Sequence, residues 1–333
     1  MRFATRHGRG NAALVFLPRG TRRKRGFACL GWVAGTVYLL ASEPAQFAPL
    51  DADPLHLGRR PEMEARPLFD GKIERIWSTA ESSIVAETNR AQAQTPWLRW
   101  RIVVDHFGGE PKYPIGWPRV WRSFQESDRD WSDWDYLEVV IRAETPRENL
   151  PSTPASLLIR PEGETSWSKP LTEVRKGNWG RFLIPLWALP KLSAINQLMF
   201  SLSDADYRHG DQVEFIIATL ALTRYSAPTL LDFAAEQTAL FADAPGLPVR
   251  FRLTGLKPAE TVEVTTELRQ AGRLVASQTL KAGRGRHHIM FEFGDRAPAA
   301  GEYEVSARIG TRPAQTGRVR LLASPWQERS AQP

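Results

Sequence analysis

Apolar and polar side chains alternate with a period of two residues through most of the chain beyond residue 70, which is the pattern of half-buried β-strands. The clearest case is the segment WLRWRIVVD, where three apolar residues share one face and two arginines share the other: Leu98, Trp100 and Ile102 against Arg99 and Arg101. Helical periodicity is weak throughout. The pattern predicts strands at Ile73–Trp77, Ser82–Glu87, Trp97–Asp105, Pro118–Gln125, Tyr136–Glu144, Ala155–Glu162, Asn178–Pro185, Ile195–Asp204 and Gln212–Tyr225.

Residues after Pro228 continue the alternation with a different composition. Tryptophan, frequent before this point, occurs only once more, at Trp326. Turn residues separate six further runs, which predict a domain of about 100 residues with six or seven strands. The predicted strands are Leu247–Leu256, Thr261–Gln270, Arg273–Ala282, His287–Gly294, Gly301–Gly310 and Gly317–Ser324.

The stretch from Asp128 to Arg142, DRDWSDWDYLEVVIR, joins a polar, turn-forming half to an aromatic and β-branched half. This is the expected sequence of a strand that emerges from a loop. Aspartate favours such turns because its carboxylate bonds nearby backbone amides. We therefore expect Trp131 and Trp134 to be structural, together with Trp179 and Trp187 further along.

Three later features extend this stretch into a recognisable order. Gly177-Asn178-Trp179 leads to Ile184-Pro185-Leu186, then come Ile195–Phe200 and the apolar strand Glu214–Leu222. This order resembles the galactose-binding-like jelly rolls that occur as carbohydrate-binding modules. The resemblance covers roughly 150 residues and implies a jelly-roll β-sandwich, while such folds bind many different ligands.

The chain departs from the resemblance in its last jelly-roll strand. Members of this family often carry an acidic residue there, near a structural calcium. This strand has Ala218 and Thr219 at the corresponding place. No calcium site is therefore carried over, and no cofactor is expected.

The later run GEYEVSARI resembles the late strand of immunoglobulin-like or fibronectin-like domains. The predicted fold class is all-β: a jelly-roll β-sandwich, then a smaller immunoglobulin-like β-sandwich, with an N-terminal apolar leader helix. The predicted divisions are a signal peptide or signal anchor (1–45), a proline-rich linker (46–67), the first sandwich (68–227), the second sandwich (228–325) and a tail (326–333).

The charge is concentrated at the N-terminus. Residues 1–45 hold eight basic residues and one acidic residue; removing them from totals of 44 and 37 leaves 36 of each. The predicted folded part is thus formally neutral, which argues against a nucleic-acid-binding surface. The basic run Arg22–Arg25 precedes 17 uncharged residues, Gly26–Ser42, which is the pattern of an export signal or an uncleaved anchor. We expect an extracytoplasmic protein that is secreted, periplasmic or anchored by this segment.

Cysteine excludes several kinds of chemistry. The only one, Cys29, lies in the predicted leader, so the folded part has no disulfide framework, thiolate zinc site or thiol nucleophile. His287-His288 could bind a metal and Asp105-His106 could form half of a catalytic relay, but no sequence motif with a known catalytic mechanism accompanies them. We expect no enzymatic activity, while a pair of carboxylates distant in the chain stays an open alternative.

Aromatic residues in polar loops are the candidate binding residues. Sugar rings pack their C–H faces on aromatic rings while polar neighbours bind the hydroxyl groups. The candidates are Tyr113, Trp117, Arg119, Trp121 and Trp167. The competing interpretation for each is packing in the core or at a sheet edge. The sequence thus favours a non-catalytic protein that binds polysaccharide or glycan; the alternative is an envelope structural or assembly protein that contacts other envelope proteins.

Overall fold

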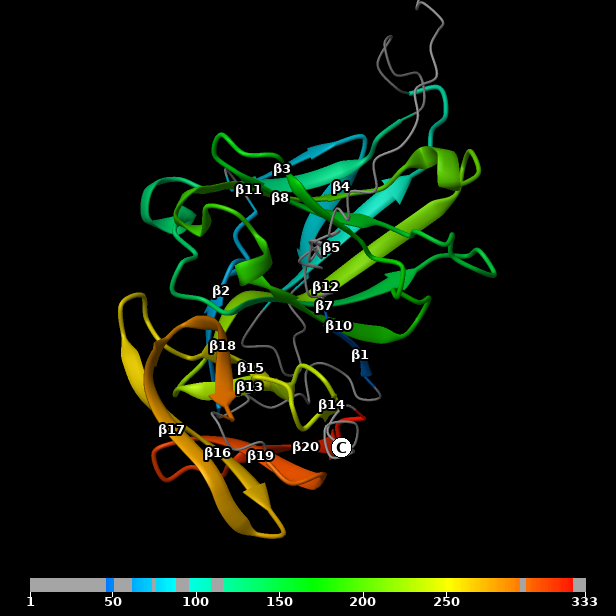
Figure 1. The fold of residues 1–333 in the computed structure, drawn as a ribbon. Coiled ribbons are helices and arrows are strands. Elements are labelled where there is room, and N and C mark those ends of the chain that lie inside the picture. The colour runs from blue at the N-terminus through cyan, green and yellow to red at the C-terminus, as the bar shows by residue number, and fades with distance from the viewer. Residues whose placement is uncertain are drawn as a thin grey trace, which may run out of the picture. The chain divides into compact units, whose positions relative to one another are not determined.

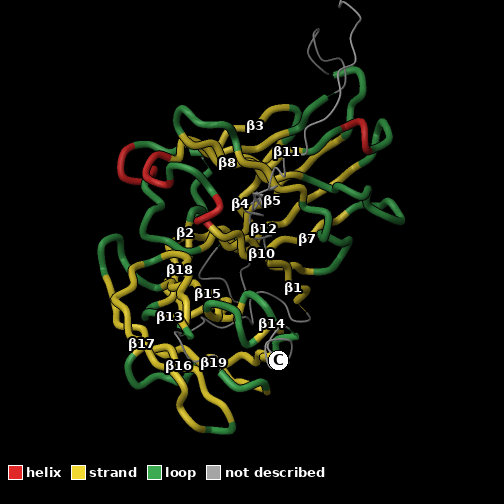
Figure 2. The backbone as a smooth tube through the Cα atoms, viewed as in Figure 1, coloured by secondary structure: helices red, strands yellow, loops and turns green. Residues whose placement is uncertain are grey.

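The computed structural model describes residues 46–50, 62–73, 76–87, 96–108, 116–293 and 298–325. Both sandwiches lie within one compact unit, residues 42–333. Figure 2 shows that strands dominate and that the helices are short. The prediction of an all-β protein is confirmed. The predicted leader helix, the tail and Tyr113 lie outside the described residues.

Two antiparallel sheets form the first sandwich (Figure 1). The larger, seven-stranded sheet is ordered β1-β10-β7-β12-β5-β4, and β2 also pairs with β12. The smaller, five-stranded sheet is ordered β3-β6-β11-β8-β9. The strands of the larger sheet are β1 (Gln46–Leu50), β2 (Met63–Pro67), β4 (Ser83–Glu87), β5 (Trp97–Val103), β7 (Tyr136–Glu144), β10 (Trp179–Pro185) and β12 (Gln212–Tyr225). Those of the smaller sheet are β3 (Trp77–Ala80), β6 (Arg119–Ser123), β8 (Ser156–Pro161), β9 (Trp167–Pro170) and β11 (Ile195–Ser201).

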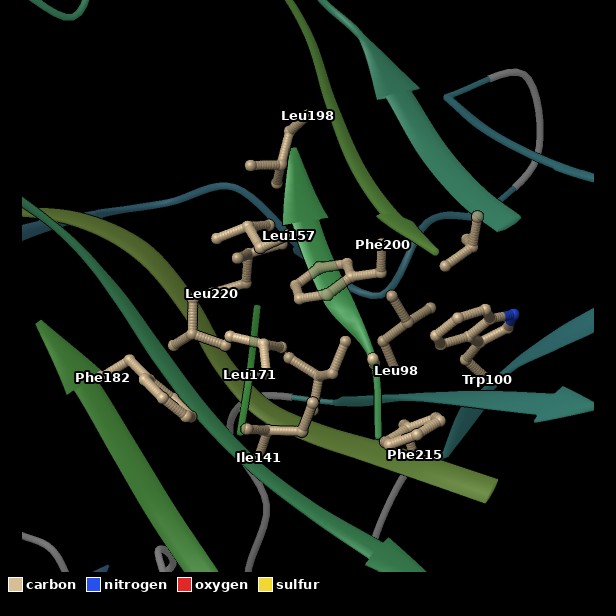
Figure 3. Packing of buried hydrophobic residues seen from close by; sticks show 14 of the residues in the cluster. Leu98, Trp100, Ile141, Leu157, Leu171, Phe182, Leu198, Phe200, Phe215 and Leu220 are labelled. Carbon is tan, nitrogen blue, oxygen red and sulfur yellow. The ribbon is translucent and has the colours of Figure 1, made fainter. Parts of the chain in front are cut away.

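The core of this sandwich is built from the inward positions that the alternation predicts. Leu98, Trp100 and Ile102 on β5 are all buried. The ring of Trp100 stacks on Phe215 of β12, with centroids 5.2 Å apart. Figure 3 shows Leu98, Trp100 and Phe215 between the two sheets, together with residues from β7, β8, β10 and β11: Ile141, Leu157, Phe182, Leu198 and Phe200.

The long strand β12 pairs with three neighbours, and its register with β7 shifts between Ile217 and Thr219. Before this irregularity β12 pairs with β5 and β7, and after it with β2 and β7. A bulge bends a strand and re-aims its side chains. Ala218 lies at this bulge, in the segment where the sequence departs from the jelly-roll pattern.

The second sandwich has a three-stranded sheet ordered β13-β15-β18 and a five-stranded sheet ordered β14-β20-β19-β16-β17. Their inward faces enclose two small apolar clusters, one around Val249 and Tyr303 and one around Phe251 and Val264. The strands are β13 (Thr229–Ala235), β14 (Ala239–Phe241), β15 (Gly246–Thr254), β16 (Thr261–Gln270), β17 (Arg273–Gly283), β18 (Gly285–Glu292), β19 (Gly301–Ile309) and β20 (Gln315–Leu322).

The segment expected to be a linker contributes strands instead. Both β1 and β2 lie within residues 46–67 and pair with β10 and β12. Proline was the basis for the linker prediction, but it is tolerated at the edge of a sheet, where no donor is missed. Pro49 lies in β1, the outer strand of its sheet, and Pro67 ends β2.

A second difference concerns Ile73–Trp77, which was predicted to be a strand. The amide nitrogens of Ile76 and Trp77 donate to the carbonyl oxygen of Ile73, at 3.3 and 3.1 Å. These bonds form a turn, and the strand β3 begins only at Trp77. The local apolar content is explained by Ile73 and Ile76 packing against the core from this turn.

Four short 3-10 helices complete the described part of the first sandwich: Glu126–Arg129, Leu186–Ala188, Leu192–Ala194 and Asp204–Asp206. Within the described ranges, no helix has the length and apolar character that crossing a membrane requires.

Candidate functional site

A groove of about 770 Å³ lies at one end of the first sandwich. Its wall comes from the outward positions of β4, β5, β7 and β12 and from the turns beside them. Eight of its eleven lining residues carry polar side chains, although apolar atoms contribute slightly more of the surface. The lining residues are Glu81, Ser82, Ser83, Arg101, Ile102, Val103, Glu144, Thr145, Pro146, Gln212 and Glu214.

The floor of the groove holds Glu144 and Glu214, which lie directly opposite each other on β7 and β12. Like charges at such a position repel. Arg99 on β5 relieves the repulsion: its Nη1 contacts both Glu214 and, at 3.5 Å, Glu144. Its Nη2 lies 2.7 Å from Glu87 of β4.

Two further arginines complete this network. Arg101 Nε lies 3.0 Å from Oε1 of Glu214, and Arg142 Nη2 lies 2.6 Å from Oε1 of Glu144. Three arginines thus balance three glutamates. Burial lowers the pKa of the Arg99 guanidinium, but its bonds to Glu87 and Glu214 outweigh this effect and the net pKa is raised.

An apolar patch adjoins the network on the same outward face. The rings of Trp97 and Trp179 meet edge to face, with centroids 5.3 Å apart. The guanidinium of Arg142 lies over the ring of Trp179, at 4.6 Å. Trp179 is buried here, so the prediction that it is structural fits its position outside the main core.

The groove is connected to the predicted aromatic residues through Glu81. Glu81 lines the groove, and its Oε2 accepts a hydrogen bond of 2.5 Å from the backbone nitrogen of Trp117. The side chain of Trp117 is 45% exposed. The backbone of Trp117, whose indole is exposed, therefore contacts a residue of the groove wall.

Trp117, Arg119 and Trp121 alternate along the chain and form a second element of the site. The Arg119 guanidinium lies over both rings, 4.9 Å from that of Trp117 and 5.9 Å from that of Trp121. Such cation–π contacts hold the rings in place. Trp121 is on the outward face of the smaller sheet, where Ser78 and Met199 lie opposite it.

A buried carboxyl group lies beside Gly116. A side chain at this position would meet Oδ2 of Asp204 at 2.4 Å and Oε2 of Glu81 at 2.7 Å, so only glycine lets both acids approach. Burial raises the pKa of Asp204 to about 6, and the negative charges of Glu81 and Asp105 add to this while the Asp105 amide and His106 oppose it. Oδ1 of Asp204 accepts no hydrogen bond within the described structure.

The histidines named in the sequence analysis have structural contacts. Nε2 of His106 lies 3.1 Å from the carbonyl oxygens of both Asp204 and Tyr207. Nδ1 of His288 lies 2.6 Å from Glu236, whereas Nε2 of His287 lies 2.7 Å from the carbonyl oxygen of Gly283. Among the described residues, no three histidine, aspartate or glutamate side chains gather as a metal site would require.

The structure brings three of the predicted site residues together and separates one. Trp117, Arg119 and Trp121 form one aromatic strip. Trp167 pairs with Ile159 across β8 and β9 and packs against the main core, so it lies on the opposite face of the sheet. Its polar sequence neighbours gave the impression of an exposed loop, but Trp167 begins a strand at the edge of the sandwich.

Sequence reasoning missed the groove. Its floor uses Glu144 and Glu214, and Arg99, which contacts both of them, lies far away in the chain. A signal was present, because Arg99 and Arg101 share the outward face of their predicted strand. Their partners could not be identified without the register of β5, β12 and β7.

Comparisons with known proteins give little further information. No protein-family model matches the chain, and no curated protein sequence matches it. Among solved structures, β-1,2-glucanase from Parabacteroides distasonis is similar at 13% identity with a TM-score of 0.32, over 80% of this chain and 38% of that one. The glycoside hydrolase domain of Spr0440, Endo-D, from Streptococcus pneumoniae R6 is similar at 8% identity and 0.23, over 73% and 37%.

The adhesin domain of Epf from Streptococcus pyogenes is similar at 12% identity with a TM-score of 0.24, over 79% of this chain and 98% of that domain. This chain therefore spans less than two fifths of the two enzymes and nearly the whole adhesin domain. Because these TM-scores are all below 0.5, the fold is described from the sheets above and not from these similarities.

Proposed function

We propose that this is an exported, non-catalytic protein whose first sandwich binds carbohydrate in the groove, with Trp117 at its rim. The observation that carries the proposal is the link through Glu81, which lines the groove and bonds the backbone of an exposed tryptophan. An indole face and a polar groove are the two elements that sugar recognition needs.

The groove has the hydrogen-bonding groups that sugar hydroxyls require. Glu144 and Glu214 accept, Arg101 donates, and Thr145 and Gln212 do both. Arg101 is half exposed and hence within reach of a ligand. Because the arginine network already fixes both glutamates, a ligand meets acceptors that are held in place before binding.

The proposal that the protein is non-catalytic draws on the same network. Each oxygen of Glu144 and of Glu214 contacts a guanidinium. Glycosidases need one carboxyl group that can hold a proton as an acid. Carboxylates bound by arginine on both oxygens are poorly suited to that task.

The binding test is a glycan array with residues 46–333, followed by affinity gels with the polysaccharides that are retained. Trp117→Ala is expected to lower affinity about tenfold, since stacking on an aromatic ring contributes roughly 1–1.5 kcal/mol. Phe241→Ala is the matched control, because Phe241 is 47% exposed and lies in the second sandwich. Binding of no glycan, or equal loss in both variants, would contradict the proposal.

Export is proposed from the N-terminal basic and apolar segments alone. Cell fractionation of the full chain tests it: the protein is expected outside the cytoplasm, and Arg22–Arg25 replaced by four glutamines is expected to remain inside. Recovery of the unaltered protein from the cytoplasm would refute export while leaving glycan binding intact.

A second candidate function, protein contact in the cell envelope, has one supporting observation. In the described structure the 11-residue strand β17 pairs with β16 alone, and Leu274 and Val275 on it are 47% and 45% exposed. An exposed edge strand can accept a strand from a partner. Under this alternative, Val275→Pro abolishes capture of an envelope partner, and glycans leave the thermal stability unchanged.

A further inference from the structure

The charges that line the groove are unequal. Glu81, Glu144 and Glu214 contribute three carboxylates, whereas Arg101 contributes the only guanidinium in the lining. The other two arginines of the network lie deeper, since the side chains of Arg99 and Arg142 are 15% and 27% exposed. A ligand in the groove therefore meets more negative than positive charge.

Glu81 is the source of the excess. Glu87, Glu144 and Glu214 are balanced by Arg99, Arg101 and Arg142. Among the described residues, no cationic side chain pairs with Glu81, which accepts a hydrogen bond from the Trp117 amide. The nearby acid Asp204 cannot offset this charge, because it is neutral below its pKa of about 6 and negative above it.

The remaining bonding capacity of these carboxylates determines what they accept. An ionised carboxylate is an acceptor with about four lone-pair sites. The guanidinium contacts occupy one site on each oxygen of Glu144 and Glu214, so further sites can accept N–H or O–H donors. A ligand that presents hydroxyl or ammonium groups satisfies them, whereas a ligand carboxylate has no donor to offer and is repelled.

From this arrangement we infer that the groove selects neutral and amino sugars and rejects uronic-acid polymers. The inference rests on the proposed function and adds the charge class of the glycan. Glu81 is assigned as the specificity-determining residue, because it holds the unbalanced charge and lies beside Trp117, where a stacked sugar would rest.

The test extends the glycan array with polymers that share a backbone and differ in charge. For β-1,4-linked glucose these are a soluble cellulose ether, chitosan and polyglucuronate; for α-1,4-linked galactose they are its neutral polymer, polygalactosamine and polygalacturonate. The neutral or amino member of a retained set is expected to bind at least tenfold more tightly than the uronate at low salt. Equal or tighter binding of the uronate would overturn the inference and leave the proposed function standing.

Glu81→Gln tests the assignment of the residue. Glutamine can still accept the Trp117 amide hydrogen bond, but it removes the charge. We expect uronate binding to improve threefold to tenfold relative to the neutral polymer, as the loss of one nearby charge predicts. Glu302→Gln, at a side chain 69% exposed in the second sandwich, is the matched control and is expected to change nothing. An unchanged ratio in Glu81→Gln would remove the assignment, and an array with no bound glycan at all would remove the proposed function and this inference with it.

Discussion

The carboxylate of Asp135, immediately before β7, lies 3.0 Å from the guanidinium of Arg284, which precedes β18 in the second sandwich. Asp135 is 1% exposed. Its other oxygen accepts the amide of Tyr225 at 3.2 Å and that of Gly255 at 3.1 Å. Arg284 also donates to the carbonyl oxygens of Ser132 and Trp134. The acidic turn of the first sandwich thus binds two segments of the second.

Asp135→Ala is expected to destabilise the protein by about 3–5 kcal/mol, because Arg284 would keep its charge in a buried place without its partner. Burial raises the pKa of Asp135 and Arg284 opposes this, so the charged pair is maintained only while both residues are present. Urea denaturation followed by tryptophan fluorescence and by circular dichroism measures the loss. The variant is also expected to unfold in two steps, since the sandwiches lose a shared bond.

Arg320→Ala serves as the control for this ion pair. Arg320 and Glu302 are 66% and 69% exposed and lie 3.6 Å apart, so their pair contributes less than about 1 kcal/mol. If Asp135→Ala cost no more than Arg320→Ala, the buried pair would not hold the sandwiches together.

Trp131→Ala is expected to cost about 3–5 kcal/mol, because Trp131 is fully buried and its removal leaves a large cavity. Its ring packs edge to face on Phe124 with centroids 5.3 Å apart, and its Nε1 donates to the carbonyl oxygen of Asp128 at 3.1 Å. Trp117→Ala, at an exposed ring, is expected to change the free energy of unfolding by less than about 1 kcal/mol. Chemical denaturation of both variants decides between a structural and a binding role, and equal losses would contradict the assignment.

The contrast between these two tryptophans shows what the sequence could predict. Trp131 lies in a turn that leads into a strongly alternating strand, and this local pattern was enough to predict a structural residue. The alternation in β5 likewise predicted which of its side chains share the core-facing side. These features depend on neighbours two to four residues away, so they can be read directly from the chain.

The parts that could not be predicted depend on strand register. Glu144 and Glu214 are 70 positions apart, and only the pairing of β7 with β12 places them opposite each other. Glu81 and Trp117 are likewise distant in the chain. They meet only because the turn between β3 and β4 contacts the segment before β6. Trp167 was misjudged because its polar neighbours concealed an edge strand whose inward side packs on the core.

Arg99→Met is expected to destabilise the protein by about 2–4 kcal/mol, since Glu87, Glu144 and Glu214 would lose the cation that they share. Methionine retains the apolar stem, so the loss reports mainly on charge. Arg101→Met, at a half-exposed arginine that contacts Glu214 alone within the network, is expected to cost less than about 1 kcal/mol. Urea denaturation at pH 7 measures both; equal costs would argue against a central role for Arg99.

Asp204 is expected to make stability depend on pH in a defined window. Its pKa of about 6 in the folded protein lies above the ordinary value of 3.8, so the folded state holds a proton that the unfolded chain has already released. Stability from this group is fully present below pH 4, falls as the pH rises to about 6, and is constant above it, with a total change of at most about 3 kcal/mol.

Asp204→Asn, which resembles the protonated form, is expected to remove this slope and to be more stable than the parent above pH 6. Asp206→Asn, at an exposed position in the same short helix, is the control and is expected to preserve the slope. Urea unfolding at pH 4, 5, 6 and 7.5 measures the free energy of unfolding of the parent and both variants. If the parent gained stability relative to Asp204→Asn between pH 4 and 6, the carboxyl group of Asp204 would be ionised over that range, which would contradict the prediction.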